Sequence, residues 1–259
     1  MAVFLKKVLF ILLVLIPVSA AAQRARVRNI PEHEFKTVHF GFTLGLNTMD
    51  FRIKHSDFAV NYTNNQLRGF YGEVSTLTPG FNINIVSNFR LSNHFDFRIL
   101  PGVAFGQRRI DFYSMPRGSG VPGSDDWDGR SEPILLSSQN IESSYLELPF
   151  IFKYKAVRIN NYKPYLIGGV NFRYDLAKNF SPDDGVFLSL NSFDTYMEVG
   201  FGIDYYLPYF KFSTELKYAT GFIDILNRRA APGGLDESKY QYSIGALYSN
   251  LIILSFHFE

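Results

Sequence analysis

The most constraining stretch of the sequence is residues 145–174, in which two alternating segments flank a short polar turn at residues 160–161. Side chains of a β-strand point alternately to opposite faces, so a period of two gives a strand one apolar and one polar face. Here the polar face carries full charges, as at Glu147 and Lys153, and the apolar face is bulky and partly aromatic. This pattern indicates a barrel with lipid outside and a polar interior.

The same alternation recurs along the chain and predicts eight strands. They lie at about residues 38–47, 81–86, 95–106, 145–155, 165–174, 197–205, 210–218 and 252–258. The connections between them alternate strictly between long and short, which is typical of outer-membrane barrels with short periplasmic turns and long outer loops. We therefore expect an all-β, eight-stranded antiparallel transmembrane barrel. Ten strands stay open if parts of the first or fourth long connection pair, and Pro101 predicts a kink or bulge.

The composition agrees with a membrane barrel. The chain has 16 Tyr and 26 Phe against one Trp, an aromatic load expected where rings form girdles at a membrane surface. Mean hydropathy is only −0.03, so apolar residues are diluted by polar ones. Beyond the N-terminus, no segment approaches the roughly 18 apolar residues of a spanning helix, so a membrane protein of this sequence requires a closed barrel. A soluble secreted barrel is the alternative.

The N-terminus reads as a secretory signal peptide over residues 1–22. Lys6 and Lys7 precede a short apolar run, and small residues up to Ala22 form the cleavage site. A retained anchor is the alternative. Residues 23–36 are predicted to be a periplasmic lead-in, and residues 37–259 the barrel in the outer membrane. Residues 1–22 contain no acid, so losing the two lysines takes the formal charge from +2 to 0 and leaves no basic surface for nucleic acid.

Alternation assigns a set of charged and polar residues to the inward face. They are Asp96, Arg98, Glu147, Lys153, Asn171, Arg173, Glu198, Asp204, Lys211, Glu215, Lys217 and His257. An eight-stranded barrel is just wide enough for its side chains to fill the interior, and buried charges need partners. We expect a structural, salt-bridged network and a closed lumen instead of a conducting channel.

Few residues suggest catalysis or ligand binding. Ser255 and His257 share a face of the last strand, but that spacing alone does not bring a nucleophile to a base. The other histidines show no metal-ligand spacing, residues 118–123 lack the Lys-Ser/Thr of a phosphate loop, and cysteine is absent. We expect no enzyme activity, no cofactor, no metal and no small-molecule substrate.

Two segments carry a resemblance to a known family. Residues 146–175, LELPFIFKYKAVRINNYKPYLIGGVNFRYD, and residues 95–108, FDFRILPGVAFGQR, resemble the PorT (SprT) family of Bacteroidota. Proteins of that family are outer-membrane barrels tied to the type IX secretion and gliding-motility machinery. The likeness is close over the third to fifth predicted strands and one of pattern elsewhere.

The resemblance implies a function that the alternation alone does not. It implies a non-enzymatic component of type IX protein secretion, with outer-membrane lipid and other secretion components as partners. The family offers no catalytic residues to carry over. Two other hypotheses stay open, namely an adhesion or surface-binding barrel that acts through its long loops, and a barrel enzyme.

Overall fold

A computed structural model of the chain describes residues 28–56, 67–74, 78–116, 133–177, 188–228 and 240–259. The predicted signal peptide lies outside these residues. One short 3-10 helix, η1 (Pro31–Phe35), precedes ten antiparallel strands of a single sheet. The strands are β1 (Val38–His55), β2 (Leu67–Val74), β3 (Thr78–Arg90), β4 (Phe95–Ile99), β5 (Gly102–Pro116), β6 (Ile134–Lys155), β7 (Tyr162–Asp175), β8 (Phe193–Tyr206), β9 (Lys211–Gly221) and β10 (Ile244–Phe258). No helix in the described ranges is long and apolar enough to cross a membrane.

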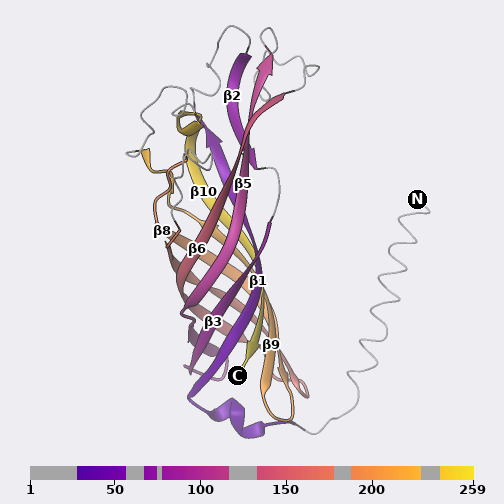
Figure 1. Ribbon diagram of the computed structural model, residues 1–259. Coiled ribbons are helices and arrows are strands. Elements are labelled where there is room, and N and C mark those ends of the chain that lie inside the picture. The colour runs from indigo at the N-terminus through magenta and orange to yellow at the C-terminus, as the bar shows by residue number, and fades with distance from the viewer. Residues whose placement is uncertain (1–27, 57–66, 75–77, 117–132, 178–187, 229–239) are drawn as a thin grey trace, which may run out of the picture.

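The sheet closes on itself as a barrel (Figure 1). The strand pairing gives the ring eight positions, here called staves, of which seven are single strands and one is β4 together with β5. Strand β1 pairs with β10 on one side and β3 on the other, and the ring continues through β4 and β5 to β6, β7, β8 and β9. Strands β4 and β5 together form one stave, and β2 pairs only with β5, outside the ring. The expected eight-stranded antiparallel barrel is confirmed. Closure matters because it leaves no unpaired strand edge in the lipid.

The pairing with β6 keeps one register across the break between β4 and β5. Ile99 pairs with Phe150 and Gly102 pairs with Glu147, a step of three residues on each strand. Of the expected kink or bulge at Pro101, the bulge is therefore absent, and the strand is instead interrupted between Ile99 and Gly102. Proline has no N–H to donate, so it interrupts the ladder between β4 and β5 without shifting the pairing.

The strands are longer than alternation predicted, and the long connections are correspondingly shorter. Strand β1 continues to His55, β5 to Pro116, and β6 begins at Ile134, although residues 48–77 and 108–144 were expected to be connections. Strands β2, β5 and β6 rise above the rest of the barrel at the end away from η1 (Figure 1). A spanning strand needs only about 9–11 residues, so these extensions stand beyond the membrane.

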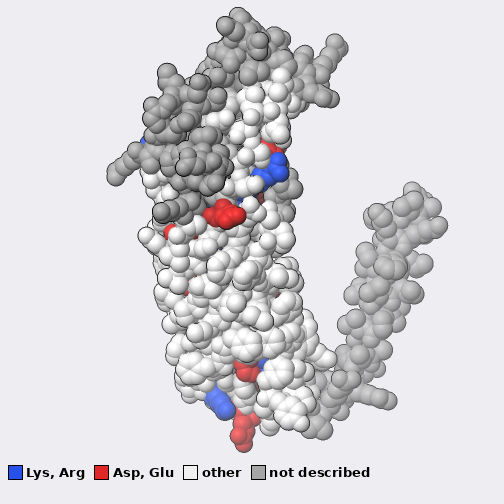
Figure 2. Space-filling model, in the orientation of Figure 1, with Lys and Arg blue, Asp and Glu red and all other residues white. Residues whose placement is uncertain are grey.

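The outer wall of the barrel is an apolar band. On β1 the outward residues are Val38, Phe40, Phe42, Leu44 and Leu46, all exposed. On the face in Figure 2, charged residues gather near the two ends, and the wall between them is almost free of them. A band of this kind is what hydrocarbon requires of a β-barrel, and it places the bilayer around the lower part of the ring.

Beyond this band, toward the outer end of the barrel, the inward and outward faces of the strands exchange polarity. On β1, the outward series turns polar at Asp50, Arg52 and Lys54, while the inward series turns apolar at Met49 and Phe51. The interior of the outer end is accordingly an apolar core like that of a water-soluble protein. Its buried members are Phe51, Phe70, Ile110, Phe112, Ile141, Leu188, Leu190, Ile225, Leu226, Ile244 and Leu247. This core closes the outer end of the lumen.

A charged lumen as the candidate functional site

The structure places all of the predicted inward residues in the barrel interior, where each is buried. They are Asp96, Arg98, Glu147, Lys153, Asn171, Arg173, Glu198, Asp204, Lys211, Glu215, Lys217 and His257. Each comes from a strand whose alternate residues face the lipid, so strand geometry alone directs it inward. Their charges fall into a cluster near the periplasmic end and a second cluster nearer the middle.

The periplasmic cluster is centred on Arg98 of β4. Its Nη1 donates to Glu215 Oε2 at 3.1 Å and its Nη2 to Glu259 Oε1 at 3.0 Å. The other oxygen of Glu259 accepts from Lys211 Nζ at 2.7 Å. One guanidinium thus links β4 to β9 and to the end of β10 across the lumen.

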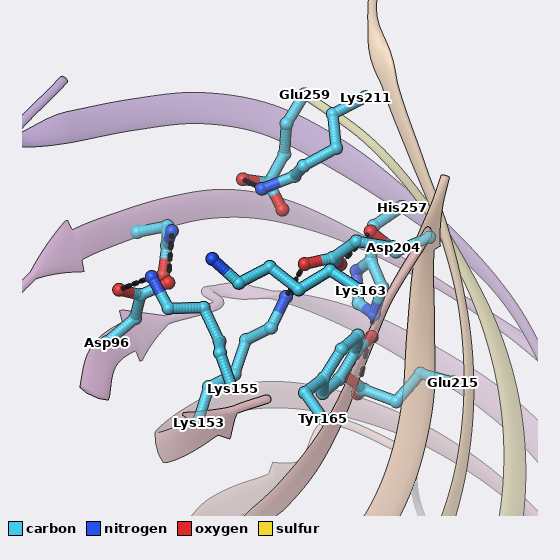
Figure 3. Close-up of polar contacts among 12 residues, drawn as sticks. Asp96, Lys153, Lys155, Lys163, Tyr165, Asp204, Lys211, Glu215, His257 and Glu259 are labelled. Carbon is cyan, nitrogen blue, oxygen red and sulfur yellow. Dashed lines mark hydrogen bonds and ion pairs between the residues drawn. The ribbon is translucent and has the colours of Figure 1, made fainter. Parts of the chain in front are cut away.

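A second ion pair lies beside this group (Figure 3). Lys153 Nζ donates to both carboxylate oxygens of Asp204 at 2.7 Å, and Ser213 Oγ donates to the same carboxylate at 2.6 Å. The Lys153 ammonium also lies 3.6 Å from the centre of the Tyr165 ring. Asp96 pairs with Lys155, the lowest inward residue of β6. Every charge of this cluster therefore has an opposite charge within reach, as burial demands.

The middle cluster is built on two glutamates. Glu147 Oε2 accepts from Arg173 Nη2 at 2.6 Å, and Glu198 Oε2 accepts from Lys217 Nζ at 3.2 Å. Asn171 joins the two carboxylates, because its Nδ2 donates to Glu198 Oε1 at 2.7 Å and to Glu147 Oε2 at 3.3 Å. The Asn171 side chain thus links β7 to β6 and β8, and the ion pair of Glu198 with Lys217 adds β9.

Arg108 forms a third polar group, where the charged interior meets the apolar core. Its guanidinium donates to the hydroxyls of Ser249, Ser143 and Tyr145 and lies 4.0 Å from the centre of the Phe51 ring. Burial of a cation against hydroxyls and an aromatic face is an alternative to pairing with a carboxylate.

Sequence reasoning missed several members of the network. Glu259 lies just past the last predicted strand, yet its side chain is fully buried between Arg98 and Lys211. Lys155 and Lys163 also point inward and pair with acids. Arg108 was placed in a loop. Lys155 already has inward parity at the end of the predicted strand 145–155. The other three lie on the inward parity as well, two or fewer residues past predicted strand ends, so continued alternation could have found them.

The interior does not bring together the serine and histidine of the last strand. Ser255 Oγ makes no hydrogen bond in the described part of the chain. His257 Nδ1 instead lies 2.6 Å from Thr43 Oγ1, and its Nε2 lies 3.3 Å from Glu215 Oε1 in a direction unsuited to a hydrogen bond. A hydroxyl, an imidazole and a carboxylate in a row resemble the groups of acyl-transfer enzymes. Thr43, His257 and Glu215 are only 1%, 0% and 3% exposed, so a substrate has no access to them.

Metal binding finds no support in the described residues, which contain no group of three His, Cys, Asp or Glu placed to hold an ion. The charged side chains satisfy one another in pairs. The arrangement holds staves together, and it offers no open coordination position or activated nucleophile.

The N-terminal lead-in caps the periplasmic mouth of the barrel. Glu34 of η1 pairs with Lys163 Nζ at 2.5 Å, and its Oε2 lies 3.5 Å from Arg158 Nη1. The His33 ring stacks on His39 of β1 with 4.1 Å between ring centres. The Asn29 carbonyl accepts a hydrogen bond from Arg158 Nη2 at 2.7 Å, and the Asn29 N–H donates to Asn161 Oδ1 at 2.9 Å. The N-terminal lead-in thus docks on the turn between β6 and β7.

Acid should release this cap. Burial, with the nearby charge of Lys211, lowers the pKa of His33 to about 4. Burial alone would raise the pKa of Glu34, but its ion pairs with Lys163 and Arg158 outweigh that effect and hold the pKa below its usual value. The detached segment therefore binds protons more readily than the docked one, so docking is complete above pH about 6.5 and weakens as the pH falls.

The measurement uses a nitroxide label on Glu32→Cys, since the chain has no native cysteine. We expect the label to gain mobility first as His33 protonates in the detached state, and again below pH about 4.5 as Glu34 loses its charge. Glu34→Gln should weaken docking at pH 7 and remove the second phase. An unchanged spectrum from pH 7 to pH 4 would contradict the docking.

A closed antiparallel ring with an apolar outer wall and a charged interior defines an outer-membrane β-barrel protein. The sequence matches the family described as "Outer membrane protein beta-barrel domain" over residues 21–227, so the chain belongs to that family. The outer membrane is its location.

Solved structures include barrels to which the chain is similar. The outer membrane protein OprG from Pseudomonas aeruginosa shares 10% identity at a TM-score of 0.39, over 85% of this chain and 92% of that one. Neisserial surface protein A, NspA, shares 10% identity at a TM-score of 0.38, over 86% and 98%. Similarities this weak transfer no function to the chain. The comparison with curated protein sequences found no match.

Proposed function

We propose that the protein is a non-enzymatic, non-conducting barrel that serves as a component of type IX protein secretion. The resemblance of residues 95–108 and 146–175 to the PorT family is the observation that carries the secretion role. In the fold these residues form β4, part of β5, and the paired strands β6 and β7, which are adjacent staves. The resembling segments therefore form one continuous side of the barrel and include the periplasmic turn between β6 and β7.

The filled interior favours a scaffold over a pore. The lumen holds ion pairs in its lower part and an apolar core at its outer end. An eight-stranded ring has room for its own side chains and little else. A component of this kind contributes through surfaces that bind other proteins, and the capped periplasmic mouth and the outer strand extensions are the two ends available for such contacts.

The reconstituted protein should conduct no ions. In planar bilayers at neutral pH we expect a baseline current without steps, because charged side chains and the apolar core occupy the lumen. Large, reproducible single-channel steps would contradict this prediction and support a porin instead. A lumen that opens only when η1 detaches would reveal itself as steps in a variant lacking residues 29–36.

Deletion of the gene tests the secretion role directly. We expect type IX cargo to accumulate in the periplasm and surface display or gliding to be lost, with recovery when the intact gene is returned. Normal secretion in the deletion strain would refute this role. Loss of attachment to a surface ligand, with secretion unchanged, would point to the adhesion barrel instead.

A further inference from the structure

A pocket of about 300 Å³ opens at the periplasmic mouth, between the β3–β4 turn, the β6–β7 turn and the η1 region. Its lining is strongly basic. The cationic residues that line it are Arg28, Arg90, Lys155, Arg158 and Lys163. Glu34 is the single acid that the described residues contribute to this lining. A surface of one sign inside a concavity concentrates counter-ions there.

The acids near the pocket do not neutralise it. Glu34 is shared between Lys163 and Arg158, and Asp96 pairs with Lys155 from inside the barrel. Two carboxylates thus face five cations, and a formal excess of three positive charges remains.

Three guanidinium groups in the pocket still have N–H donors that could bind an anion. Arg28 makes no ion pair or hydrogen bond with the described residues. Within the described ranges Arg90 donates to two neutral acceptors, the Phe35 carbonyl at 3.2 Å and Asn93 Oδ1 at 2.6 Å. The side chain of Arg158 is 3% exposed, and its Nε and Nη2 already donate to neutral acceptors. Its Nη1 lies 3.5 Å from Glu34 Oε2 but makes no hydrogen bond with the described residues. A buried guanidinium nitrogen without an acceptor is costly unless a ligand supplies one.

The pocket lies at the edge of the lipid-facing wall. The lowest outward residues of β4 and β6, Phe95 and Tyr154, lie directly above it with 5.0 Å between ring centres, and Phe152 continues the wall upward. Around the pocket itself, Phe35 is 71% exposed and Val157 is 70% exposed. Aromatic residues at the end of an apolar band mark the headgroup level of a bilayer.

We propose that this pocket binds the phosphate group of a phospholipid in the inner leaflet of the outer membrane. Arg28 and Arg90 supply planar donor groups of the kind that bind phosphate oxygens two at a time, and Arg158 adds one donor through Nη1. The acyl chains lie along the wall formed by Phe95, Tyr154 and Phe152. The apolar wall favours a lipid over an acidic peptide, because a peptide would use only the charged part of the site. This inference rests on the barrel and is independent of any role in secretion.

The test compares two variants that lose the same number of charges. Arg28→Gln/Arg90→Gln removes two pocket cations that have no carboxylate partner in the part of the chain that the structure describes. Lys36→Gln/Lys54→Gln removes two cations outside the pocket. Each purified, delipidated barrel is titrated with dioleoyl phosphatidylglycerol and read by native mass spectrometry, after heat-modifiable gel migration has shown that it is assembled. Loss of two charge-assisted contacts should weaken binding by roughly tenfold or more, and the control variant should match the wild type.

Parallel titrations with inorganic phosphate and with a hexaglutamate peptide identify the source of the anion. Tight lipid binding that neither reagent displaces at millimolar concentration supports the proposal. Equal lipid affinity in the two double variants would overturn it. Displacement of the lipid by phosphate alone would assign the pocket to a free anion, and preferential binding of the peptide would assign it to an acidic protein; either outcome refutes the lipid site.

Discussion

Replacing Arg98 by methionine should destabilise the barrel by roughly 3–5 kcal/mol, the cost of removing one partner from a buried ion pair. Arg98 is the shared partner of Glu215 and Glu259, at 3.1 and 3.0 Å. Without it, Glu215 keeps a neutral hydrogen bond from the Tyr165 hydroxyl and a poorly oriented contact with His257. Among the described residues, Lys211 is then the one cation left to Glu259. The measurement is reversible urea unfolding in lipid vesicles, followed by gel migration of the folded and unfolded forms.

Two further variants separate a lost charge from lost packing. Arg98→Met/Glu215→Gln/Glu259→Gln removes both carboxylates along with the cation and should recover much of the stability, because replacing a whole buried ionic group is often close to neutral. Arg52→Met at the outer end, a similar substitution on an exposed side chain, should cost less than about 1 kcal/mol. A similarly small loss at Arg98 would mean that the lumen is hydrated and its ion pairs are screened.

An arginine at Phe201 should cost about 2–4 kcal/mol, the penalty for a cation near the middle of the lipid-facing wall. Phe201 lies in β8, opposite Leu166 of β7 and Leu216 of β9, and is 57% exposed. Its neighbours on both sides are therefore apolar and face the lipid, so the guanidinium has no partner within the bilayer.

Phe201→Leu is the matched control and should change stability far less, since leucine is also apolar and can face the hydrocarbon without a penalty for burying a charge. Both variants are compared with the wild type by the same unfolding assay. A loss for Phe201→Arg no larger than that for Phe201→Leu would place the wall in water and remove the argument for the membrane span.

The faces of the strands could be read from the sequence, and their lengths could not. Parity assigned every residue of the inward set to the correct face because a strand admits only two directions. The strand ends were misplaced because the strands were recognised by their apolar outward residues. On β1 these residues stop at Leu46, although the strand runs to His55. The exchange of polarity between the faces, at Thr48 and Met49, resembles the start of a loop unless both faces are followed.

Which inward residues pair with one another could also not be predicted from the sequence. Arg98 and Glu215 are 117 positions apart, and their contact depends on the stagger of strands around the ring. Alternation shows that a residue points inward but says nothing about its height along the axis. The role of Glu259 is the clearest case, since its meeting with Arg98 depends on the register of β10 against β1 and β9.

The long strands β5 and β6 also determine how far the protein reaches. The part of β6 from Ile134 to Ser144 lies beyond its last lipid-facing residue, Leu146, and at about 3.3 Å per residue, with the tilt of a barrel strand, it rises roughly 30 Å past the apolar band. Antiparallel pairing with β5 makes this arm a ribbon instead of a flexible loop. Anything that approaches the cell from outside therefore meets the ribbon well before it meets the lipid headgroups.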